Sequence, residues 1–428
     1  MKWPTWMFRA PAEVDVKARR TLVFVALALL FEEYDTAMLF SALKQIAEDL
    51  DMHTEDFGLF TALIRLGGLP AFLVVPIADR LGRRPVFIAA TVLLGVLTVA
   101  TAFVQTPTQF TVLQAFARLF VVTSTATAFV IVTEELPAQH RGWGVGMLAA
   151  IGSLGHGLSA ILFSQIDRLP YGWRALYVVG IVPVLCLPLL LRFVPETQRF
   201  LAQKAQRGER EDGRPLGVSS IAATLAAGIA PMRELFTVQP GRASALGLCG
   251  ILVAGATLPT IQFSGYYTQT KLGWSPGQYS TMMIVAGGLG IAGNVIAGRL
   301  GDRYGRRIIG ALFMAAFPAT SYFFFHGSST VVVLSWVPLV FSLMGARVIL
   351  RALSAELFAT AQRGAASGVF SVAEMLGAIA GLLLVHAYGT PSIQEIGRVV
   401  PAVALLNVGC ALIVLQFPET RQRELEDV

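Results

Sequence analysis

Gly298-Arg-Leu-Gly-Asp-Arg-Tyr-Gly-Arg-Arg307 is a short basic stretch between two long apolar runs, and it decides the fold because it occurs twice. The near copy is Val75-Pro-Ile-Ala-Asp-Arg-Leu-Gly-Arg-Arg84, and the aspartates of the two copies are 302 − 79 = 223 residues apart. Each copy has a glycine before its last two arginines, Gly82 or Gly305, and glycine allows the backbone to turn sharply. The stretch therefore predicts a tight basic turn at two equivalent places.

Two further motifs repeat at the same offset. Glu134-x-x-Pro-x-x-x-Arg141-Gly142 returns as Glu356-x-x-Ala-x-x-x-Arg363-Gly364, with 356 − 134 = 222. Pro195-Glu-Thr197 returns as Pro418-Glu-Thr420, with 418 − 195 = 223. Three motifs in the same order at the same offset indicate an internal duplication. The chain is therefore predicted to consist of two equivalent halves.

The composition is typical of a membrane protein. Of 428 residues, 55% are hydrophobic and 14% are charged, whereas a soluble domain carries about 25% charge. Residues 1–20 are mixed and basic, and the first apolar run is long enough to span a membrane, so no cleavable signal peptide is expected. The net charge of +6 comes from arginines clustered in alternate loops, and no nucleic-acid partner is expected from it.

The apolar blocks predict an all-α membrane protein with two pseudo-symmetric six-helix bundles. A span needs about 20 apolar residues. Twelve stretches meet this requirement: 21–46, 56–78, 86–105, 109–133, 142–166, 174–194, 243–265, 277–298, 307–325, 330–355, 365–389 and 396–417. The predicted domains are an N-terminal segment 1–20, bundles 21–198 and 242–418, a central loop 199–241, and a C-terminal tail 419–428.

The distribution of arginine and lysine predicts the orientation. Basic residues precede the first span and fill every second loop, while the acidic loop Glu48 to Asp56 lies on the other face. By the positive-inside rule both termini and the 199–241 loop are expected in the cytoplasm, and the protein in the plasma (inner) membrane. Within that loop, Pro231 to Phe236 could form a short amphipathic helix on the membrane surface or a plain loop.

The repeated motifs resemble those of the major facilitator superfamily, over nearly the whole chain. The branches that resemble it most are the aromatic acid:proton symporters, the sugar porters and the organic-ion transporters. The resemblance implies twelve spans around a central cavity, a small-molecule substrate, and alternating access. It also implies gating roles for the charged residues of the motifs: Asp79, Arg80, Arg83, Asp302, Arg303, Arg306, Glu134, Arg141, Glu356 and Arg363.

Charged residues inside the first span are the strongest functional signal, because charge inside a bilayer is costly. Glu32 lies 32 − 20 = 12 residues beyond Arg20, roughly 18 Å into the span at about 1.5 Å per residue. Glu32 and Asp35 are three residues apart and share a helix face, while Glu33 points elsewhere. Phe31-Glu-Glu-Tyr-Asp-Thr36 resembles the Asp-Gly-x-Asp of the aromatic-acid symporters, with Glu33 in place of the glycine. Glu32 and Asp35 are therefore predicted to carry a proton.

Other charged and aromatic residues within spans are candidates for substrate binding: Arg118, His156, Arg347, Glu374, Tyr34 and Tyr266. Arg347 and Glu374 are expected at one depth, and Arg351 is expected to belong with Glu356. Purely structural roles are the alternative: a structural Arg347–Glu374 pair, a satisfied buried His156, and packing aromatic residues. Glu32, Asp35, Arg118 and His156 have no charged counterpart at the repeat offset, so the substrate site is expected to be asymmetric.

These features favour proton-coupled symport of a small organic anion, aromatic or hydrophobic, with Arg118 and Arg347 pairing with its carboxylate. Alternatives are proton-antiport efflux of hydrophobic cations, sugar transport, and a non-transporting receptor. The sequence has no Walker motif or nucleophile elbow, so no enzyme is expected. Its cysteines lie in apolar runs without metal spacing, so no metal or other cofactor is expected. Partners are expected to be protons, a small molecule and lipid, and the protein is expected to be a monomer.

Overall fold

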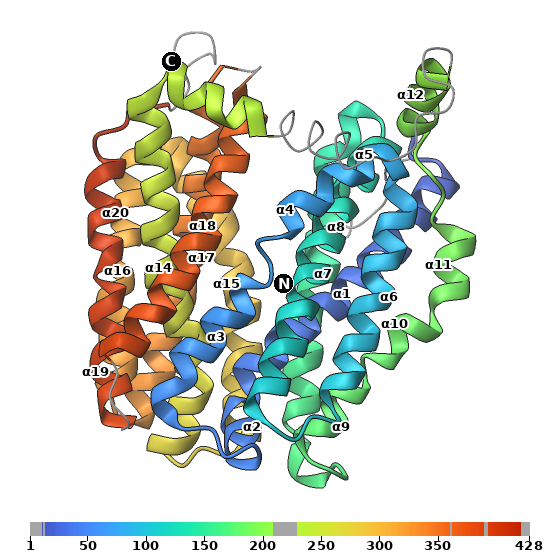
Figure 1. The fold of residues 1–428 in the computed structure, drawn as a ribbon. Coiled ribbons are helices and arrows are strands. Elements are labelled where there is room, and N and C mark those ends of the chain that lie inside the picture. The colour runs from blue at the N-terminus through green and yellow to red at the C-terminus, as the bar shows by residue number, and fades with distance from the viewer. Residues whose placement is uncertain (1–10, 12, 209–228, 360–361, 389–392, 421–428) are drawn as a thin grey trace. The chain divides into compact units, whose positions relative to one another are not determined.

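The computed structural model describes residue 11 and residues 13–208, 229–359, 362–388 and 393–420 (Figure 1). The described residues form helices and connecting turns and contain no strand, which confirms the all-α prediction. Ten helical segments among them are long and apolar enough to cross a membrane. The two other predicted spans correspond to α1 (Val16–Ser41), which carries three acidic residues, and α15 (Pro276–Tyr304).

The first half of the chain contains long helices interrupted by short ones. They are α2 (Leu43–Asp49), η2 (Thr54–Asp56), α3 (Phe57–Leu66), α4 (Ala71–Val74), η3 (Val75–Ile77), α5 (Ala78–Leu81), α6 (Arg83–Thr101), α7 (Pro107–Glu135), η4 (Ala138–His140), α8 (Arg141–Phe163), η5 (Ile166–Arg168), α9 (Trp173–Val178), α10 (Ile181–Leu185), α11 (Leu187–Phe193) and α12 (Gln198–Gly208). The second half adds α14 (Pro240–Lys271), α16 (Arg306–His326), α17 (Ser329–Glu356), α18 (Arg363–Tyr388), α19 (Ile393–Ala404) and α20 (Leu406–Val414).

Two of the predicted spans in the first half are broken rather than continuous. The second is interrupted between α3 and α4 at Gly67-Gly68-Leu69-Pro70, where proline cannot donate a helical hydrogen bond. A Cβ atom on Gly67 would collide with the backbone of Ala115, so this break lets the chain approach α7 closely. The sixth is divided into α9, α10 and α11, and a Cβ on Gly180 at the first break would meet Thr98 at 2.7 Å.

The chain divides into two compact units. Unit 1 comprises Met1–Met38, Gly67–Leu162 and Arg168–Ala226, and unit 2 comprises Leu39–Leu66, Phe163–Asp167 and Ala227–Val428. In unit 1, α6 packs along α7, and buried residues of α1 such as Val25 and Leu29 share a core with Ile131 of α7. Helix α8 contacts α1 so closely that a Cβ on Gly155 would collide with the carbonyl oxygen of Leu30.

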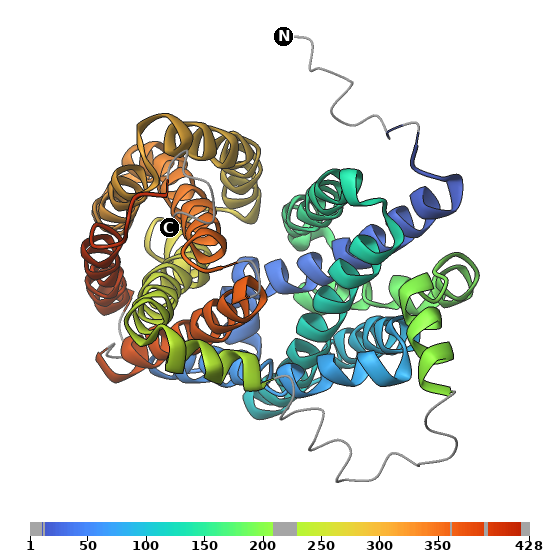
Figure 2. The same cartoon turned by 90° about the horizontal axis from the view of Figure 1, so that it is seen from above.

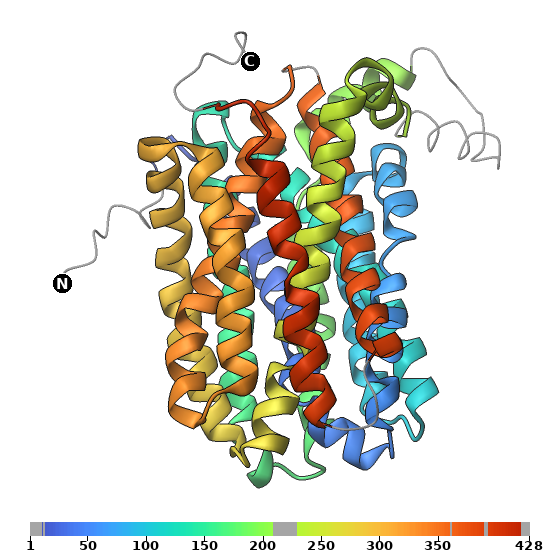
Figure 3. The ribbon, with the colours of Figure 1, turned by 90° about the vertical axis from the view of Figure 1, so that its left-hand side faces the viewer.

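In unit 2 the long helices α14, α16, α17, α18 and α20 run side by side (Figures 2 and 3). The tightest pair is α14 with α18, where glycines of the two helices face each other. A Cβ on Gly250 would lie 2.9 Å from the Cβ of Ala373, and Gly381 lies against the backbone of Gly255. Small residues thus fix the register of α18 on α14.

Unit 2 also contains the segment Leu39–Leu66 from the first half of the chain. Helix α2 contacts α14, where Gln45 Nε2 donates to Gln269 Oε1 at 2.7 Å. Helix α3 contacts α18, and a Cβ on Gly58 would lie 2.6 Å from the carbonyl oxygen of Leu382. These contacts attach the segment to unit 2 at several points.

Part of the central loop is described. Residues 229–238 are helical, which agrees with the helical alternative for Pro231 to Phe236. Met232 and Leu235 pack against the core of unit 2, so this helix is anchored by its apolar side chains. The central loop begins with helix α12, residues 209–228 of it fall outside the described residues, and so does the tail beyond Thr420.

Candidate functional site

Glu32 is buried in unit 1 and held by hydroxyl groups. Its side chain is 1% exposed. Thr125 Oγ1 donates to Glu32 Oε2 at 2.8 Å, and Ser124 Oγ donates to Oε1. Ser124 also lies 3.0 Å from the hydroxyl of Thr91 on α6. A hydroxyl network from α6 and α7 therefore surrounds this carboxyl group.

Asp35 is also buried and faces the same pair of helices. Thr98 Oγ1 of α6 donates to Asp35 Oδ1 at 2.8 Å, and the residue is 5% exposed. Both acids turn toward α6 and α7, as their spacing of three predicts. Arg118 of α7 donates from Nη1 to Thr36 Oγ1 at 3.0 Å, and the charges of Glu33 and Asp35 act on its guanidinium group.

Glu33 points to a different helix, as predicted. Its carboxylate lies 3.5 Å from Nδ1 of His156 on α8. Both side chains are more than a third exposed, at 37% for Glu33 and 40% for His156. The contact exists because Gly155 lets α8 approach α1. His156 therefore has an acidic partner, and its assignment to substrate binding stays a prediction.

Tyr34 occupies a packed position. It is 1% exposed, and its hydroxyl donates to the carbonyl oxygen of Leu176 at 2.8 Å. This bond attaches α1 to α9. The hydroxyl is already used, and the proposed contact of Tyr34 with substrate stays a prediction.

In unit 2 a second group of charges lies between α17 and α18. Arg351 Nη2 donates to Glu374 Oε2 at 2.6 Å, and Arg347 Nε lies 3.9 Å from Glu374 Oε1. Arg347 and Glu374 thus meet, as their predicted depth requires. The prediction that Arg351 belongs with Glu356 is wrong. Glu356 is bound instead by Arg306 and by Thr420 Oγ1, the latter at 2.7 Å.

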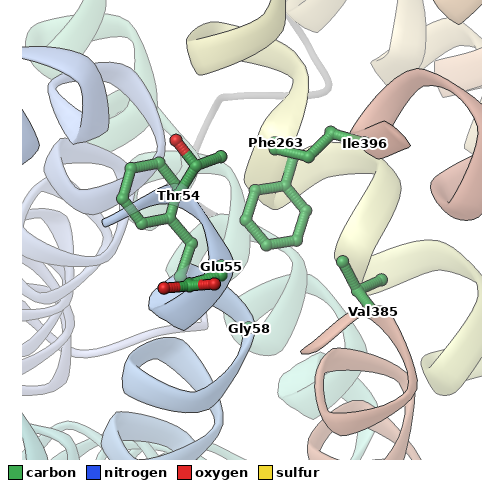
Figure 4. A pocket seen from close by; sticks show the side chains of 7 residues that line it. Thr54, Glu55, Gly58, Phe263, Val385 and Ile396 are labelled. Carbon is green, nitrogen blue, oxygen red and sulfur yellow. The ribbon is translucent and has the colours of Figure 1, made fainter. Parts of the chain in front are cut away.

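Tyr266 lies far along α14 near the start of α3. Its hydroxyl is 3.2 Å from Thr54 Oγ1, and its ring makes an edge contact with Phe57. A small pocket with a cavity volume of about 10 Å³ opens beside these residues (Figure 4). It is lined by Thr54, Glu55, Phe57, Gly58, Phe263, Val385 and Ile396. Ligand pockets usually enclose about 300–1,000 Å³, so this one is too small for a typical organic substrate.

The first basic turn is held by the Pro-Glu-Thr motif. Glu196 Oε1 accepts from the backbone N–H of Arg83 at 3.0 Å, at the start of α6. Arg83 Nε lies 3.3 Å from Glu134, and Thr197 Oγ1 donates to the same carboxylate at 2.6 Å. The sequence marks Glu196 and Thr197 as a repeat, but their role in binding this turn becomes visible only in the structure.

The second basic turn repeats the arrangement in unit 2. Glu419 Oε1 accepts from the backbone N–H of Arg306 at 2.9 Å, and Arg306 pairs with Glu356, which Thr420 also contacts. Gly82 and Gly305 have φ of 108° and 101°, which confirms the predicted sharp turns. At Gly305 a Cβ atom would lie 2.6 Å from Glu419, so backbone conformation and space both require glycine there.

The remaining predicted gating residues lie in the two basic turns or at the starts of α8 and α18. Asp302 pairs with Arg306 of its own turn at 3.2 Å, and the Arg303 guanidinium lies over the Tyr304 ring. Arg80 is exposed in the first turn, and the side chain of Asp79 lies outside the described part of the structure. Arg141 and Arg363 begin α8 and α18, and Nε of Arg141 and Nε and Nη2 of Arg363 are buried without a hydrogen-bond partner among the described residues.

Comparison with known sequences identifies the family. Residues 25–389 match the profile of the Major Facilitator Superfamily. The chain belongs to this superfamily. It is therefore a multi-pass integral membrane transporter of small molecules rather than an enzyme.

Several relatives are named for organic acids. The niacin transporter NiaP of Acinetobacter baylyi is 25% identical over 96% of this chain and 97% of its own length. The gallate transporter of Pseudomonas putida is 27% identical over 43% of this chain and 41% of its own length. The cis,cis-muconate transport protein of Acinetobacter baylyi is 25% identical over 67% of this chain and 66% of its own length.

Solved structures confirm the fold. The inward-open xylose transporter XylE of E. coli has a TM-score of 0.71 at 20% identity, covering 96% of this chain and 98% of XylE. A bacterial homologue of the human lysosomal transporter Spinster gives the same TM-score at 14% identity, over 94% of this chain and 97% of the homologue. The predicted twelve-helix major facilitator fold is thereby confirmed.

Proposed function

We propose that this transporter is a proton-coupled symporter of a small organic anion. The observation that carries the proposal is the hydroxyl-bound pair of buried acids, Glu32 and Asp35, in the first span. A buried carboxylate is costly unless it is hydrogen-bonded or protonated. This pair provides two places where a proton can be taken up and released.

The hydroxyl partners suit a group that changes its protonation state. A serine or threonine hydroxyl donates to a carboxylate and, after rotation, accepts from a carboxylic acid. Ser124, Thr125 and Thr98 can therefore satisfy Glu32 and Asp35 in either state. An arginine partner could satisfy only the charged state. The environment thus supports a proton site more than a permanent ion pair.

Arg118 provides the link between proton and substrate in this proposal. Its positive charge interacts with the negative charge of Asp35. A bound substrate anion would offset part of this positive charge, and the acid would take up a proton to restore the charge balance. Anion and proton would then bind together, as symport requires. The names of the gallate, niacin and muconate relatives support an organic acid as the cargo.

The two duplicated halves are the bodies that would move during transport. We propose that bundles 21–198 and 242–418 rock about the substrate site and open it to one side at a time. The basic turns would lie in the cytoplasm with both termini, the carrier would reside in the plasma (inner) membrane, and it would work as a monomer. The acids Glu32 and Asp35 also fit proton-antiport efflux of a hydrophobic cation, which is the second candidate.

Reconstitution of two neutralised variants tests the proton site. Asp35→Asn and Glu32→Gln imitate the protonated acids and cannot release a proton. We expect each to lose pH-driven accumulation of labelled benzoate in proteoliposomes and to retain part of the counterflow exchange. Concentrative uptake at the wild-type rate in both variants would contradict the proposal. Proton-driven expulsion of a hydrophobic cation by the wild type would favour efflux instead.

A further inference from the structure

We infer that Arg347 is the primary binding site for the substrate carboxylate and that Glu374 and Arg351 set its charge selectivity. The inference deepens the proposed function, because it rests on an organic anion as cargo. It moves the main anion contact from Arg118 in unit 1 to the α17–α18 pair of unit 2. The reasons lie in the contacts, exposure and charge balance of these three residues.

Arg347 has capacity for another partner. Its side chain is 52% exposed, and its ion pair with Glu374 spans 3.9 Å, too long for a hydrogen bond. Among the described residues no hydrogen bond to its guanidinium is found. Arg347 lies nine residues before Glu356 on α17, about 13 Å from that helix end. An arginine facing lipid at this depth is costly, so its exposed side is expected to face water or substrate.

Arg351 already has its partners. Its guanidinium donates to Glu374 at 2.6 Å and lies 5.4 Å from the centre of the Phe370 ring, which is fully buried. Arg347 and Arg351 are one helical turn apart, as are Phe370 and Glu374 on α18. Arg351 is thus hydrogen-bonded to Glu374, both arginines share that carboxylate, and Arg347 can still bind a further anion.

Helix α18, which carries Glu374, packs tightly against α14. A Cβ atom on Gly250 of α14 would lie 3.1 Å from the carbonyl oxygen of Phe370 and 3.3 Å from the backbone nitrogen of Glu374. Glu374 is 15% exposed, and its backbone is part of this tight contact between α14 and α18. A site supported by a rigid element keeps its geometry between binding events.

The formal charge of the cluster selects the ligand. Two arginines and one glutamate leave one positive charge, which a monocarboxylate neutralises. The planar guanidinium fork of Arg347 matches a carboxylate with two parallel hydrogen bonds. In unit 1, Arg118 is instead surrounded by the charges of Glu33 and Asp35, which repel an anion. Arg347 is therefore the more favourable position for a small monoanion.

Binding in detergent, without a gradient, tests the site. Thermal-shift titrations use benzoate, its neutral isostere benzamide, and the dianion terephthalate on purified protein. Benzoate should stabilise the wild type and benzamide should not. Arg347→Gln should bind benzoate about 10- to 100-fold more weakly, as expected for loss of charged hydrogen bonds. Arg398→Gln, which removes an exposed arginine paired with Glu395, is the control and should bind as the wild type does.

Glu374→Gln tests the same site without removing an arginine. It leaves both positive charges, so the preference for terephthalate over benzoate should rise about tenfold, the change that about 1.4 kcal/mol produces. An unchanged preference contradicts the selectivity assignment. Benzoate binding by Arg347→Gln at wild-type strength, or no difference between benzoate and benzamide in the wild type, overturns the site.

The two proposals fail in different measurements. If Arg347→Gln loses benzoate binding while wild-type uptake does not depend on the pH gradient, the anion site at Arg347 is supported and proton coupling is contradicted. If Asp35→Asn loses pH-driven uptake while Arg347→Gln binds benzoate normally, proton coupling stands and the anion site falls.

Discussion

The two units are nearly identical at their basic turns and opposite in their interior charges. In each unit an arginine at a helix start binds a glutamate with its side chain and the glutamate of a Pro-Glu-Thr motif with its backbone N–H, and the threonine of that motif donates to the first glutamate. Away from the helix ends, the described spans of unit 1 carry Glu32, Glu33 and Asp35 against Arg118, whereas α17 and α18 of unit 2 carry Arg347 and Arg351 against Glu374. The basic turns are the same in both units, whereas the charged residues within the spans are mostly acidic in unit 1 and mostly basic in unit 2.

The repeat offset locates the reversal at one position. Ser124 and Thr125 provide the hydroxyls that bind Glu32, and 347 − 124 = 223 and 347 − 125 = 222 place Arg347 at the equivalent point of the second half. At this position the first half has neutral hydroxyl donors that bind the buried Glu32. The second half has Arg347, whose guanidinium can bind a further anion. Under the two proposals above, one half would handle the proton and the other the anion.

The largest effect is expected from labelling, which tests whether the two turns lie on one side. Single cysteines at Arg80 and Arg303 in a Cys186→Ser background should both resist an impermeant thiol reagent applied to intact cells. A cysteine at His53, which is exposed at the other end, should react fully. Cys249 and Cys410 are buried and contribute little background. Labelling of one turn but not the other would break the equivalence.

Alanine at either turn glycine should destabilise its own half to a similar extent. Gly82→Ala and Gly305→Ala impose a left-handed backbone on alanine and push against Glu196 or Glu419. The cost should be about 2–4 kcal/mol, from backbone strain and overpacking. Melting temperatures in detergent measure it, with Gly142→Ala as control because no described atom lies within 4 Å of its Cβ position. A lower melting temperature for only one of the two variants would show that the two turns are not structurally equivalent.

Neutralising the two turn aspartates should separate gating from local pairing. We propose that Asp79 takes part in gating on the cytoplasmic side. Asp79→Asn should then shift the population toward the inward-open state about 5- to 150-fold, for a loss of about 1–3 kcal/mol. Asp302 is 66% exposed and paired within its own turn, so Asp302→Asn should have less effect. Cysteine accessibility of the cavity from the cytoplasmic side is the measurement, and an unchanged value in Asp79→Asn removes the gate role.

The smallest effect is expected from a single hydroxyl. Thr98→Val removes the hydroxyl that donates to Asp35, so the carboxylate loses a hydrogen bond. The loss of about 1 kcal/mol should slow pH-driven uptake about fivefold and leave exchange intact. Thr260→Val is the matched control, since Thr260 lies 3.3 Å from Ser321 in unit 2 and contacts no acid. Equal slowing in both variants would show a packing effect instead.

The frame was predictable from sequence because it depends on local signals. Apolar length predicts the spans, the repeat offset predicts two halves, and glycine before paired arginines predicts the sharp turns. The interruption of the second span was also marked by Gly67-Gly68-Leu69-Pro70, although apolar length alone suggested one continuous helix. The site depends instead on how helices rotate against each other. No local pattern shows that Ser124 and Thr125 face Glu32.

The wrong partner for Arg351 shows the same limit. Glu356 is five residues away on the same helix, so the two side chains do not lie on one face. The actual partner, Glu374, comes from a neighbouring helix whose position is set by glycines of α14 and α18. The role of Glu196 was missed for a related reason, since its partner turn lies 113 residues earlier in the chain.

That separation has a consequence for synthesis. The turn at Gly82 leaves the ribosome long before Glu196, and the turn at Gly305 long before Glu419, again 113 residues later. Neither turn can complete its hydrogen bonds until the last helix of its own half has been made. Each turn therefore matures late in the synthesis of its own half, and the segment Leu39–Leu66 of the first half must wait for α14 and α18 of the second.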